Sequence, residues 1–213
     1  RPWVGFRGCS VTLPNKQSAL SYVQQQGGWI EPLVAKIGAT NTLIISDDSR
    51  FMAYNTDYGG AMDAVVNSLN IGRCDLAGMS VAIVGAGGVS RAIVAGFRDV
   101  GAKVKIYNRT VAKAEKLGAE FGCAFASIDA LQDLQADLLI NCTSIGMHPH
   151  VNATPVPDEL LNQDMAVFDT ICNPLVTRLL GLAQARGART IDGVAMFVAQ
   201  AQAQYRLFTG LEG

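Results

Sequence analysis

The sequence of 213 residues is poor in several features that mark common classes of protein. It has two histidines, His148 and His150, which flank a proline, so a zinc site lacks ligands and no metal is expected. The 17 basic and 18 acidic residues nearly cancel, which argues against nucleic acid or an anionic membrane as the main partner. No apolar run approaches the length of a membrane span, and the first residues lack the pattern of a signal peptide.

The number and spacing of the cysteines are not those of a disulfide framework. There are five cysteines, an odd number, and no two of them form a C-x-x-C pair. Four lie in or beside apolar segments, which indicates buried thiols in a reducing compartment, so a cytoplasmic location is expected. The five residues are Cys9, Cys74, Cys123, Cys142 and Cys172.

The order of apolar and polar segments predicts an α/β fold with two lobes. Residues 1–77 suggest a strand at 3–13, a helix at 17–26, a hairpin at 40–54 and a helix at about 58–69. From residue 79, strands and helices alternate, which is typical of a parallel, doubly wound (Rossmann-like) sheet. Strands are expected near 80–84, 103–107, 124–126, 137–141, 165–169 and 189–191, and helices near 89–100, 111–121, 175–186 and 193–209. We therefore predict a nucleotide-binding domain at 78–192 and a smaller α/β substrate domain formed by 1–77 with 193–213.

The most informative glycine cluster lies in residues 81–92, where an apolar strand runs into a glycine turn and an amphipathic helix. In that context a glycine cluster indicates a dinucleotide site. Gly85 permits the tight turn, and Gly87 lets a pyrophosphate approach the main chain and the positive end of the helix. The spacing fits G-x-G-x-x-G/A only loosely, because Ser90 stands at the third small position. The predicted cofactor-binding residues here are Gly85, Ala86, Gly87, Gly88 and Val89.

The residues after the next predicted strand, Asn108, Arg109 and Thr110, favour NADP as the dinucleotide. An acidic residue there would bind the ribose 2′-hydroxyl of NAD, whereas a guanidinium pairs with the 2′-phosphate of NADP. Thr110 is the expected helix N-cap, and Lys113 adds a positive charge one turn later. The alternative interpretation is an ordinary exposed arginine in a strand–helix loop.

Two charged residues in the first lobe stand where a strand gives way to a helix. Lys16 follows Pro14, which fixes the backbone before it, and Asp57 lies near a helix N-terminus. Reduction of a carbonyl by hydride leaves an alkoxide, to which a lysine ammonium supplies a proton while a carboxylate holds the ammonium in place. The alternative is that both are ordinary surface residues at helix starts.

The motifs, in this order, resemble those of the shikimate dehydrogenases essentially from end to end. The pair Gln200 and Gln204 is closest to the shikimate dehydrogenase half of fused dehydroquinate dehydratase–shikimate dehydrogenase proteins. The matching segments are residues 10–16 (SVTLPNK), 38–43 (GATNTL), 54–57 (YNTD), the glycine turn with 108–110 (NRT), 141–147 (NCTSIGM), and 193–200 (GVAMFVAQ) with 208–210 (FTG).

The resemblance implies an NADP-dependent oxidoreductase that acts on a CH–OH group, reducing 3-dehydroshikimate reversibly to shikimate in the chorismate pathway to aromatic amino acids. Lys16 and Asp57 would be the catalytic pair, and Thr143 and Gly193 would join the cofactor-binding residues. The small-molecule substrate would be the main partner, beside fusion to or association with a dehydroquinate dehydratase. The implied substrate-binding residues are Thr12, Asn41, Cys172, Gln200 and Gln204, and the i,i+4 spacing of the two glutamines puts them on one helical face.

The sequence departs from the family pattern in two places. Cys172 stands before Asn173-Pro174 where the family has Tyr, and a thiol is a weak donor, so weaker shikimate binding is expected. The opening strand with a Ser-x-Ser-Pro segment is absent and the sequence does not begin with Met, so it is expected to be a piece of a longer polypeptide.

Two other functions fit the same motifs. One is a quinate/shikimate dehydrogenase with altered substrate preference, which Cys172 allows, although Arg109 favours NADP where quinate enzymes often use NAD. The other is a non-catalytic ligand-sensing domain of the same fold. The presence of Lys16, Asp57 and Gln200 argues against the sensing domain.

Overall fold

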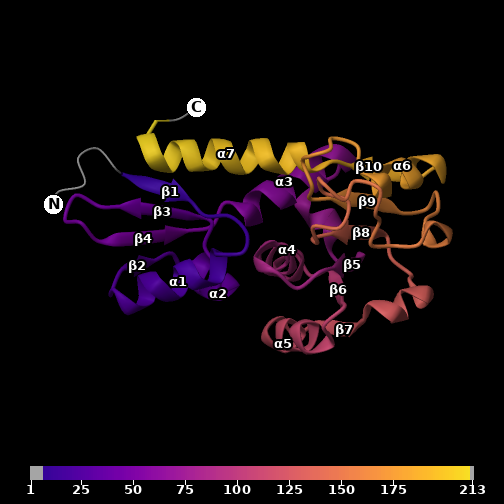
Figure 1. Ribbon diagram of the computed structural model, residues 1–213, viewed down its shortest axis with the longest axis horizontal. Coiled ribbons are helices and arrows are strands. Elements are labelled where there is room, and N and C mark those ends of the chain that lie inside the picture. The colour runs from indigo at the N-terminus through magenta and orange to yellow at the C-terminus, as the bar shows by residue number, and fades with distance from the viewer. Residues whose placement is uncertain (1–6, 212–213) are drawn as a thin grey trace.

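The computed structural model describes residues 7–211, apart from the side chain of Asp133, and arranges them around two sheets (Figure 1). The first sheet has four strands in the order β1-β3-β4-β2, and the second has six in the order β10-β9-β8-β5-β6-β7. The predicted α/β class, with a doubly wound sheet beside a smaller α/β lobe, is confirmed. The first part of the strand predicted at 3–13 lies outside the described residues.

The first lobe is a small mixed sheet whose apolar face is covered by short helices. β3 and β4 form the predicted antiparallel hairpin, with Thr42 opposite Tyr54 and Ile45 opposite Phe51. The sequence pattern predicts neither β2 nor α2, because two residues and six residues are too short to show a periodicity. The elements are β1 (Gly8–Ser10), α1 (Lys16–Gln25), β2 (Trp29–Ile30), α2 (Pro32–Ile37), β3 (Thr42–Ile45), β4 (Phe51–Tyr54) and α3 (Asp57–Leu69).

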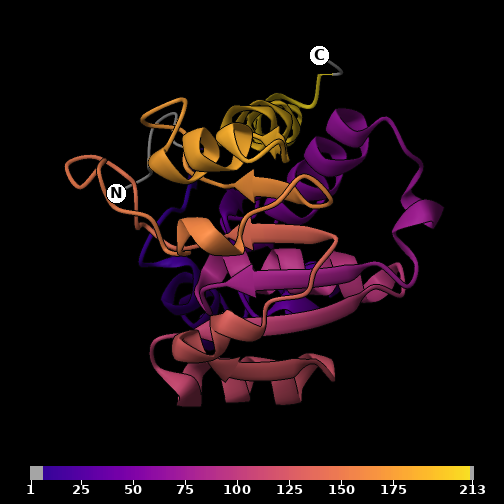
Figure 2. The same cartoon turned by 90° about the vertical axis from the view of Figure 1, so that its right-hand side faces the viewer.

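The second lobe is a parallel sheet whose strands are stacked in Figure 2. Its strand order is that of the doubly wound nucleotide-binding fold. From β5 the chain first adds strands on one side of the sheet (β6, β7) and then, from β8, on the other, so the switch point lies between β5 and β8. The strands are apolar on both faces, because α4 and α5 cover one face and α6 covers the other. The elements are β5 (Ser80–Val84), α4 (Gly88–Asp99), β6 (Lys103–Asn108), α5 (Val111–Phe121), β7 (Ala124–Ser127), β8 (Leu138–Asn141), β9 (Ala166–Asp169), α6 (Arg178–Ala185) and β10 (Arg189–Ile191), with short 3₁₀ turns η1 (Arg73–Leu76), η2 (Ile128–Asp133) and η3 (Asp158–Leu160).

The helix predicted at 175–186 begins later than expected. The Thr177 hydroxyl accepts a hydrogen bond from Leu180 N, which makes Thr177 the N-cap of α6. The preceding residues, from Asn173 on, form a loop beside the carboxyl end of β9.

Two helices link the lobes. α7 (Gly193–Thr209) begins beside β10 and runs back over β1 and β3 (Figure 1). α3 packs along α7, and its buried side chains share one apolar cluster with the parallel sheet. The division into residues 1–77 with 193–213 and residues 78–192 stays a prediction.

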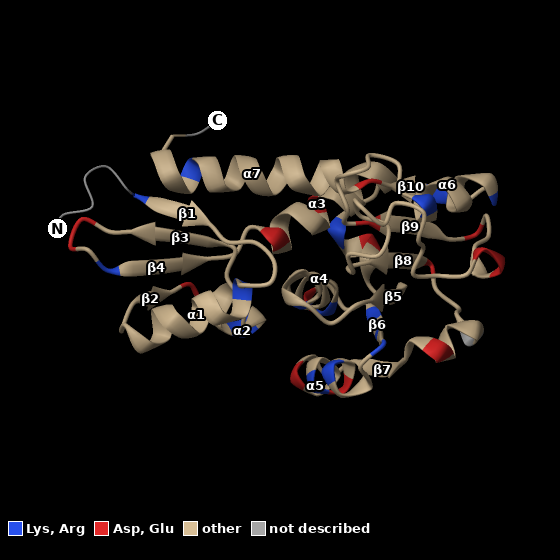
Figure 3. Cartoon of the chain, viewed as in Figure 1, with Lys and Arg blue, Asp and Glu red and all other residues tan. Residues whose placement is uncertain are grey.

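Charges are mixed along the surface helices rather than gathered by sign. α5 carries both basic and acidic residues (Figure 3), in keeping with a net charge of −1. No helix in the described part of the chain combines the length and apolar character that crossing a bilayer requires.

Candidate active site

Lys16 and Asp57 form a buried ion pair at the meeting of the two lobes. Lys16 Nζ donates to Asp57 Oδ2 at 2.6 Å, and their side chains are 8% and 6% exposed. Each is the first residue of its helix, α1 and α3 respectively. A buried ion pair lasts only with further polar partners, and Asp57 Oδ1 accepts from Asn41 Nδ2 at 3.0 Å. The interpretation of the two as unrelated surface residues is therefore wrong.

The turn before α3 aims the carboxylate of Asp57. Asn55 Oδ1 accepts from Asp57 N at 3.0 Å, and Asn55 Nδ2 donates to Ala39 O at 2.9 Å. One asparagine thus ties the start of α3 to the segment that leads into β3. The result is a fixed position for Asp57 relative to Asn41.

Asn41 is the centre of a polar cluster next to the ion pair. Its Oδ1 accepts from Thr56 N at 2.9 Å, and its Nδ2 donates to Thr56 Oγ1 at 2.9 Å. Gln200 Oε1 lies 3.4 Å from both Asn41 Nδ2 and Thr56 Oγ1. These two distances are long for hydrogen bonds, so Gln200 is loosely held beside the pair. Amides and hydroxyls of this kind bind hydroxyl groups of a ligand.

α7 reaches this cluster because α3 carries a glycine at the crossing. A Cβ at Gly60 would stand 3.0 Å from Met196 O and 3.1 Å from Gln200 Cβ, so only glycine allows the observed approach without a shift. This contact brings Gln200 of α7 within reach of Thr56, the N-cap of α3.

Gln204 has a different environment from Gln200. It is buried, its Oε1 accepts from Ser10 Oγ at 2.8 Å, and its Nε2 donates to Asn41 O and Thr42 Oγ1. These bonds tie α7 to β1 and β3. Thr12, in the loop after β1, is exposed, and the neighbouring Val11 N donates to Asn41 O at 2.7 Å.

The glycine turn has the form that a dinucleotide requires. Gly85 has φ of +114°, and a Cβ there would lie 3.1 Å from the carbonyl carbon of Cys142. Gly87 is exposed, and a Cβ there would meet no described atom within 4 Å, which leaves room for a phosphate. Ser90 Oγ accepts from Gly87 N at 3.1 Å, so the serine at the third small position braces the turn. Ala86 and Val89 are half-buried beside it.

Lys16 and the glycine turn touch directly. A Cβ on Gly88 would lie 3.0 Å from Lys16 Cβ and 3.2 Å from Lys16 Cδ. A cavity of about 380 Å³ opens at this contact between the lobes. It is lined by Leu13, Pro14, Lys16, Gln17, Ala86, Gly87, Gly88, Arg91, Lys113, Lys116 and Leu117.

The segment after β6 is arranged much as a 2′-phosphate site would need. Thr110 is the N-cap of α5, although its side chain makes no capping bond, and Asn108 Nδ2 donates to Thr110 O at 2.8 Å. Arg109 is exposed and takes part in none of the ion pairs found among residues 7–211. A guanidinium at a helix N-terminus suits a phosphate.

The carboxyl ends of β8 and β9 are joined by a buried carboxylate, Asp169. It accepts from Asn141 Nδ2, Ile171 N and Thr177 Oγ1, at 3.0, 3.1 and 2.7 Å. Burial raises its pKa, against the lowering effect of these hydrogen bonds. Asn141 Oδ1 in turn accepts from both Thr143 N and Thr143 Oγ1, so Thr143 is held in place through this network.

Cys172 and Gly193 lie together at the start of α7. Cys172 Sγ donates to Gly193 O at 3.3 Å, and burial, with Asp192 and Asp169 nearby, raises the pKa of this thiol. A Cβ on Gly193 would lie 2.5 Å from Ile171 O, so glycine is required for this approach. Cys142 is half-buried behind the glycine turn, and the loss of solvation there raises the pKa of its thiol to about 12.

Sequence reasoning missed several residues that contribute to the site. Asn55 and Thr56 belong to the segment 54–57, which resembles a motif of the family. Their position next to Asp57 in that motif could have indicated that they contribute to the site. Gln17, Arg91 and Lys116 line the cavity. Helical i,i+3 spacing from Gly88 and Lys113 would have indicated Arg91 and Lys116, whereas no spacing rule indicates Gln17.

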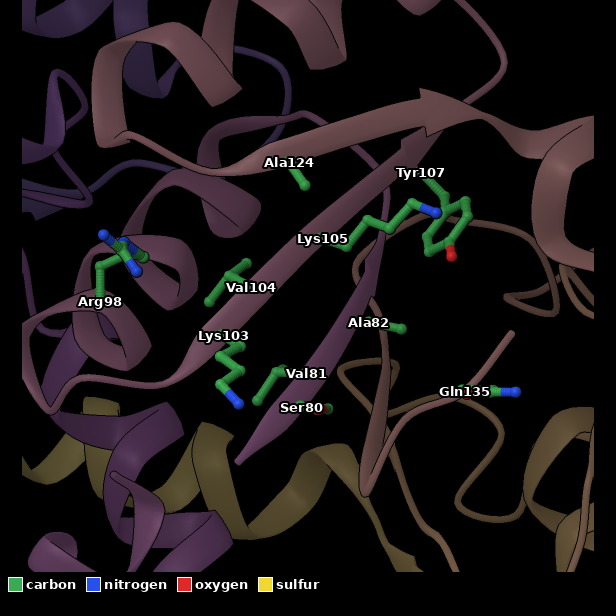
Figure 4. A pocket seen from close by; sticks show the side chains of 10 residues that line it. All are labelled: Ser80, Val81, Ala82, Arg98, Lys103, Val104, Lys105, Tyr107, Ala124 and Gln135. Carbon is green, nitrogen blue, oxygen red and sulfur yellow. The ribbon is translucent and has the colours of Figure 1, made fainter. Parts of the chain in front are cut away.

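Another cavity of about 380 Å³ lies on the parallel sheet at the beginnings of β5, β6 and β7 (Figure 4). The glycine turn is at the opposite end of β5, so this cavity is separate from the candidate site. Among the described residues, no group of three or more His, Cys, Asp or Glu side chains is placed to hold a metal ion.

Known proteins resemble this chain in sequence and in fold. The family model described as "Shikimate / quinate 5-dehydrogenase" matches residues 68–178. The chain is similar to the shikimate dehydrogenase (NADP(+)) of Methanosarcina barkeri, at 37% identity over 98% of this chain and 75% of that protein. It is also 36% identical to the bifunctional 3-dehydroquinate dehydratase/shikimate dehydrogenase of Arabidopsis thaliana, over 97% of this chain and 36% of that protein. The crystal structure of a Thermus thermophilus shikimate 5-dehydrogenase with NADP(H) and shikimate superposes with a TM-score of 0.83 at 34% identity, over 97% and 74% of the two chains.

Proposed function

This chain belongs to the shikimate / quinate 5-dehydrogenase family, and we propose that it catalyses the reversible, NADP(H)-dependent reduction of 3-dehydroshikimate to shikimate. The observation that carries the proposal is the buried Lys16–Asp57 pair packed against the glycine turn. A proton donor and a cofactor loop in direct contact are what carbonyl reduction by hydride needs.

The residues around the glycine turn fit NADP. Gly87 leaves open space before the first turn of α4, whose N–H groups have no acceptors within the helix. Arg109 and Lys113 would hold the 2′-phosphate, and Asn108 with Thr110 would shape that corner. When bound, the cofactor supplies or accepts the hydride. Thr143 and Gly193 would border its other end, which lies nearer to Cys172.

Lys16 carries the proton in this proposal. As a carbonyl becomes a hydroxyl, the Nζ ammonium gives a proton to the new alkoxide oxygen, and Asp57 keeps the ammonium aimed. In the reverse direction Lys16 Nζ accepts that proton. The aliphatic part of Lys16 lies on Gly88, which limits the positions that Nζ can take.

The substrate would occupy the space beside Asn41, Thr12 and Gln200. The weakly held Oε1 of Gln200 is available to a hydroxyl group. Gln204 has its amide engaged within the protein, so it would act by holding Asn41 and Thr42 in place. Cys172 would stand near the substrate with a weak donor already directed to Gly193 O.

The setting of the reaction follows from the same proposal. The five cysteines are free, which fits a reducing, cytoplasmic location. Association with, or fusion to, a dehydroquinate dehydratase fits the Arabidopsis relative, in which one protein is named for both activities.

The test is absorbance in the NADPH band with purified protein, shikimate and NADP, repeated with quinate and with NAD. Fast reduction of NADP with shikimate, and slower reaction in the other three combinations, is the expected result. Turnover with quinate and NAD alone would indicate the quinate enzyme. No turnover with any pair, alongside normal NADP binding, would indicate a ligand-sensing domain.

A further inference from the structure

Arg91 is a buried arginine that the proton-transfer step does not use. It lies in α4, one turn after Gly87 and Gly88, with a side chain only 9% exposed. Its Nε donates to Ile37 O, the last carbonyl of α2, and its Nη2 pairs with Glu120 of α5. One side chain therefore joins the first lobe to two helices of the second lobe.

The surroundings of Arg91 form a closely packed joint between the lobes. Ile37 and Ala39 pack against Ala92 and Ala95 in one buried apolar cluster, where α2 lies next to α4 in Figure 1. The guanidinium also lies over the Phe121 ring, 5.7 Å from its centroid. A Cβ on Gly38 would lie 2.6 Å from Arg91 Nη2, so the absence of a side chain at Gly38 lets the chain pass this close to the guanidinium.

The two segments that Arg91 connects lead to the two halves of the site. Gly38 has φ of +71° and begins the short stretch that ends at Asn41, the residue bonded to Asp57. On the other side, α4 begins at the glycine turn. Arg91 thus fixes the distance between the segment that carries Asn41 and the turn that carries Gly87.

We propose that Arg91 is a positioning residue: it sets the substrate segment at Asn41 against the cofactor turn at Gly87 and Gly88. This inference rests on the proposed function. Hydride transfer depends on the relative placement of two ligands, and an error of about 1 Å costs on the order of 10²-fold in rate. Most of the residues proposed to bind each ligand come from one lobe, whereas hydride transfer needs the two ligands placed against each other. Arg91 therefore governs turnover rather than affinity.

A different role for Arg91, as a ligand of the cofactor phosphates, is argued against by its contacts. Arg91 borders the cavity, but its Nε and Nη2 are directed to Ile37 O and Glu120. Lysine cannot replace this arrangement, because one ammonium does not span two acceptors as a planar guanidinium does.

The experiment compares Arg91→Lys and Arg91→Met with wild type by three measurements. These are turnover with shikimate and NADP, the dissociation constant of NADP by titration calorimetry, and hydrogen–deuterium exchange of the peptide that spans residues 38–43. We expect kcat to fall at least tenfold. The KM for shikimate and the NADP dissociation constant stay within threefold, and exchange in 38–43 rises.

Two further variants complete the design. Lys36→Met removes the exposed ion pair with Asp99, another contact between the lobes, and is expected to behave as wild type in all three measurements. Glu120→Gln keeps an acceptor for Arg91 but removes its charge, so it supplies a milder change should the Arg91 variants fold poorly. It is expected to lower kcat by a smaller factor, again without weakening NADP binding.

Two outcomes overturn the proposal. One is unchanged kcat and unchanged exchange in 38–43. The other is an NADP dissociation constant raised tenfold or more, which would make Arg91 a phosphate ligand. If wild type itself does not oxidise shikimate, the proposed function fails, and calorimetry and exchange still decide whether Arg91 holds the segment at Asn41.

Discussion

Among single side chains, Lys16 has two parts with different roles: the Nζ ammonium, which is proposed to carry the proton, and the aliphatic stem, which packs on Gly88. A substitution can remove the first and keep the second. Lys16→Met keeps the stem on Gly88 and removes Nζ, so turnover should fall by about 10²–10⁴-fold, the contribution of a general acid. NADP affinity should change little. Steady-state rates with shikimate and calorimetry with NADP measure both.

The same variant should also lower stability. Removing one partner of a buried ion pair leaves an uncompensated charge, which costs about 3–5 kcal/mol in the free energy of unfolding. Adding Asp57→Asn to Lys16→Met should recover part of that loss without recovering turnover. Urea unfolding of the two variants is the measurement, and equal stability of both would contradict the argument.

Cys172 is one of the positions where the sequence departs from the motif pattern that it otherwise resembles. Cys172→Tyr supplies a phenolic donor, and a hydrogen bond to a charged carboxylate contributes about 1.5–3 kcal/mol. The KM for shikimate should therefore fall roughly tenfold or more. An unchanged KM would show that this side chain does not reach the substrate.

Among the elements, α7 depends on a glycine at its first residue. Gly193→Ala places a Cβ 2.5 Å from Ile171 O, so the helix must shift, at a cost of about 1–3 kcal/mol. Because Gln200 lies two turns along the same helix, the KM for shikimate should rise as well. Thermal unfolding and steady-state kinetics measure the two effects.

Gly181→Ala in α6 is the matched control for this substitution. A Cβ at Gly181 meets nothing within 4 Å, and alanine is favoured over glycine inside a helix by up to about 1 kcal/mol. Stability should therefore rise, with unchanged kinetics. Destabilisation by both variants would mean that the contact with Ile171 is not the cause.

Most elements of the fold were predictable, because the strands of the second sheet are apolar and the helices between them are amphipathic. β2 and α2 were not, because they are short and are held by neighbours rather than by their own pattern. At the site, Lys16 and Asp57 were found from motif and position. The engagement of Gln204 by Ser10 and Thr42 was not predictable, because it depends on where α7 crosses β1 and β3.

For the molecule as a whole, the site is assembled from distant parts of the chain. The hydrogen bonds that close it join residues 144 to 194 positions apart in sequence. Contacts of such separation form late, because loop closure must precede them. We therefore regard the substrate side of the site as the part whose integrity depends most on the complete fold.

The stability of the whole fold should carry a pH dependence from Asp169. Burial raises the pKa of this carboxyl in the folded state above its unfolded value of about 3.9. The protonated carboxyl therefore contributes stability in full below the unfolded pKa, and this contribution is lost as pH rises through the folded-state pKa. The amide side chain of the Asp169→Asn variant does not ionise, so the variant does not lose stability in this way as pH rises. The free energy of unfolding of the variant, minus that of wild type, should therefore increase from pH 4 to pH 7.

Urea unfolding at each unit of pH measures this difference. A constant difference would show that the hydrogen bonds from Asn141, Ile171 and Thr177 cancel the effect of burial, and a difference that falls as pH rises would show that they outweigh it.

The contact between Gly88 and the stem of Lys16 has a consequence for how such an enzyme can be altered. Any side chain at Gly88, in the turn proposed to hold the cofactor, would displace Lys16, the residue proposed to deliver the proton. Cofactor choice and acid catalysis are therefore not independent traits in this chain. Changes in preference are better sought at Arg109 and Lys113, which are exposed and take no part in the contact between Gly88 and Lys16.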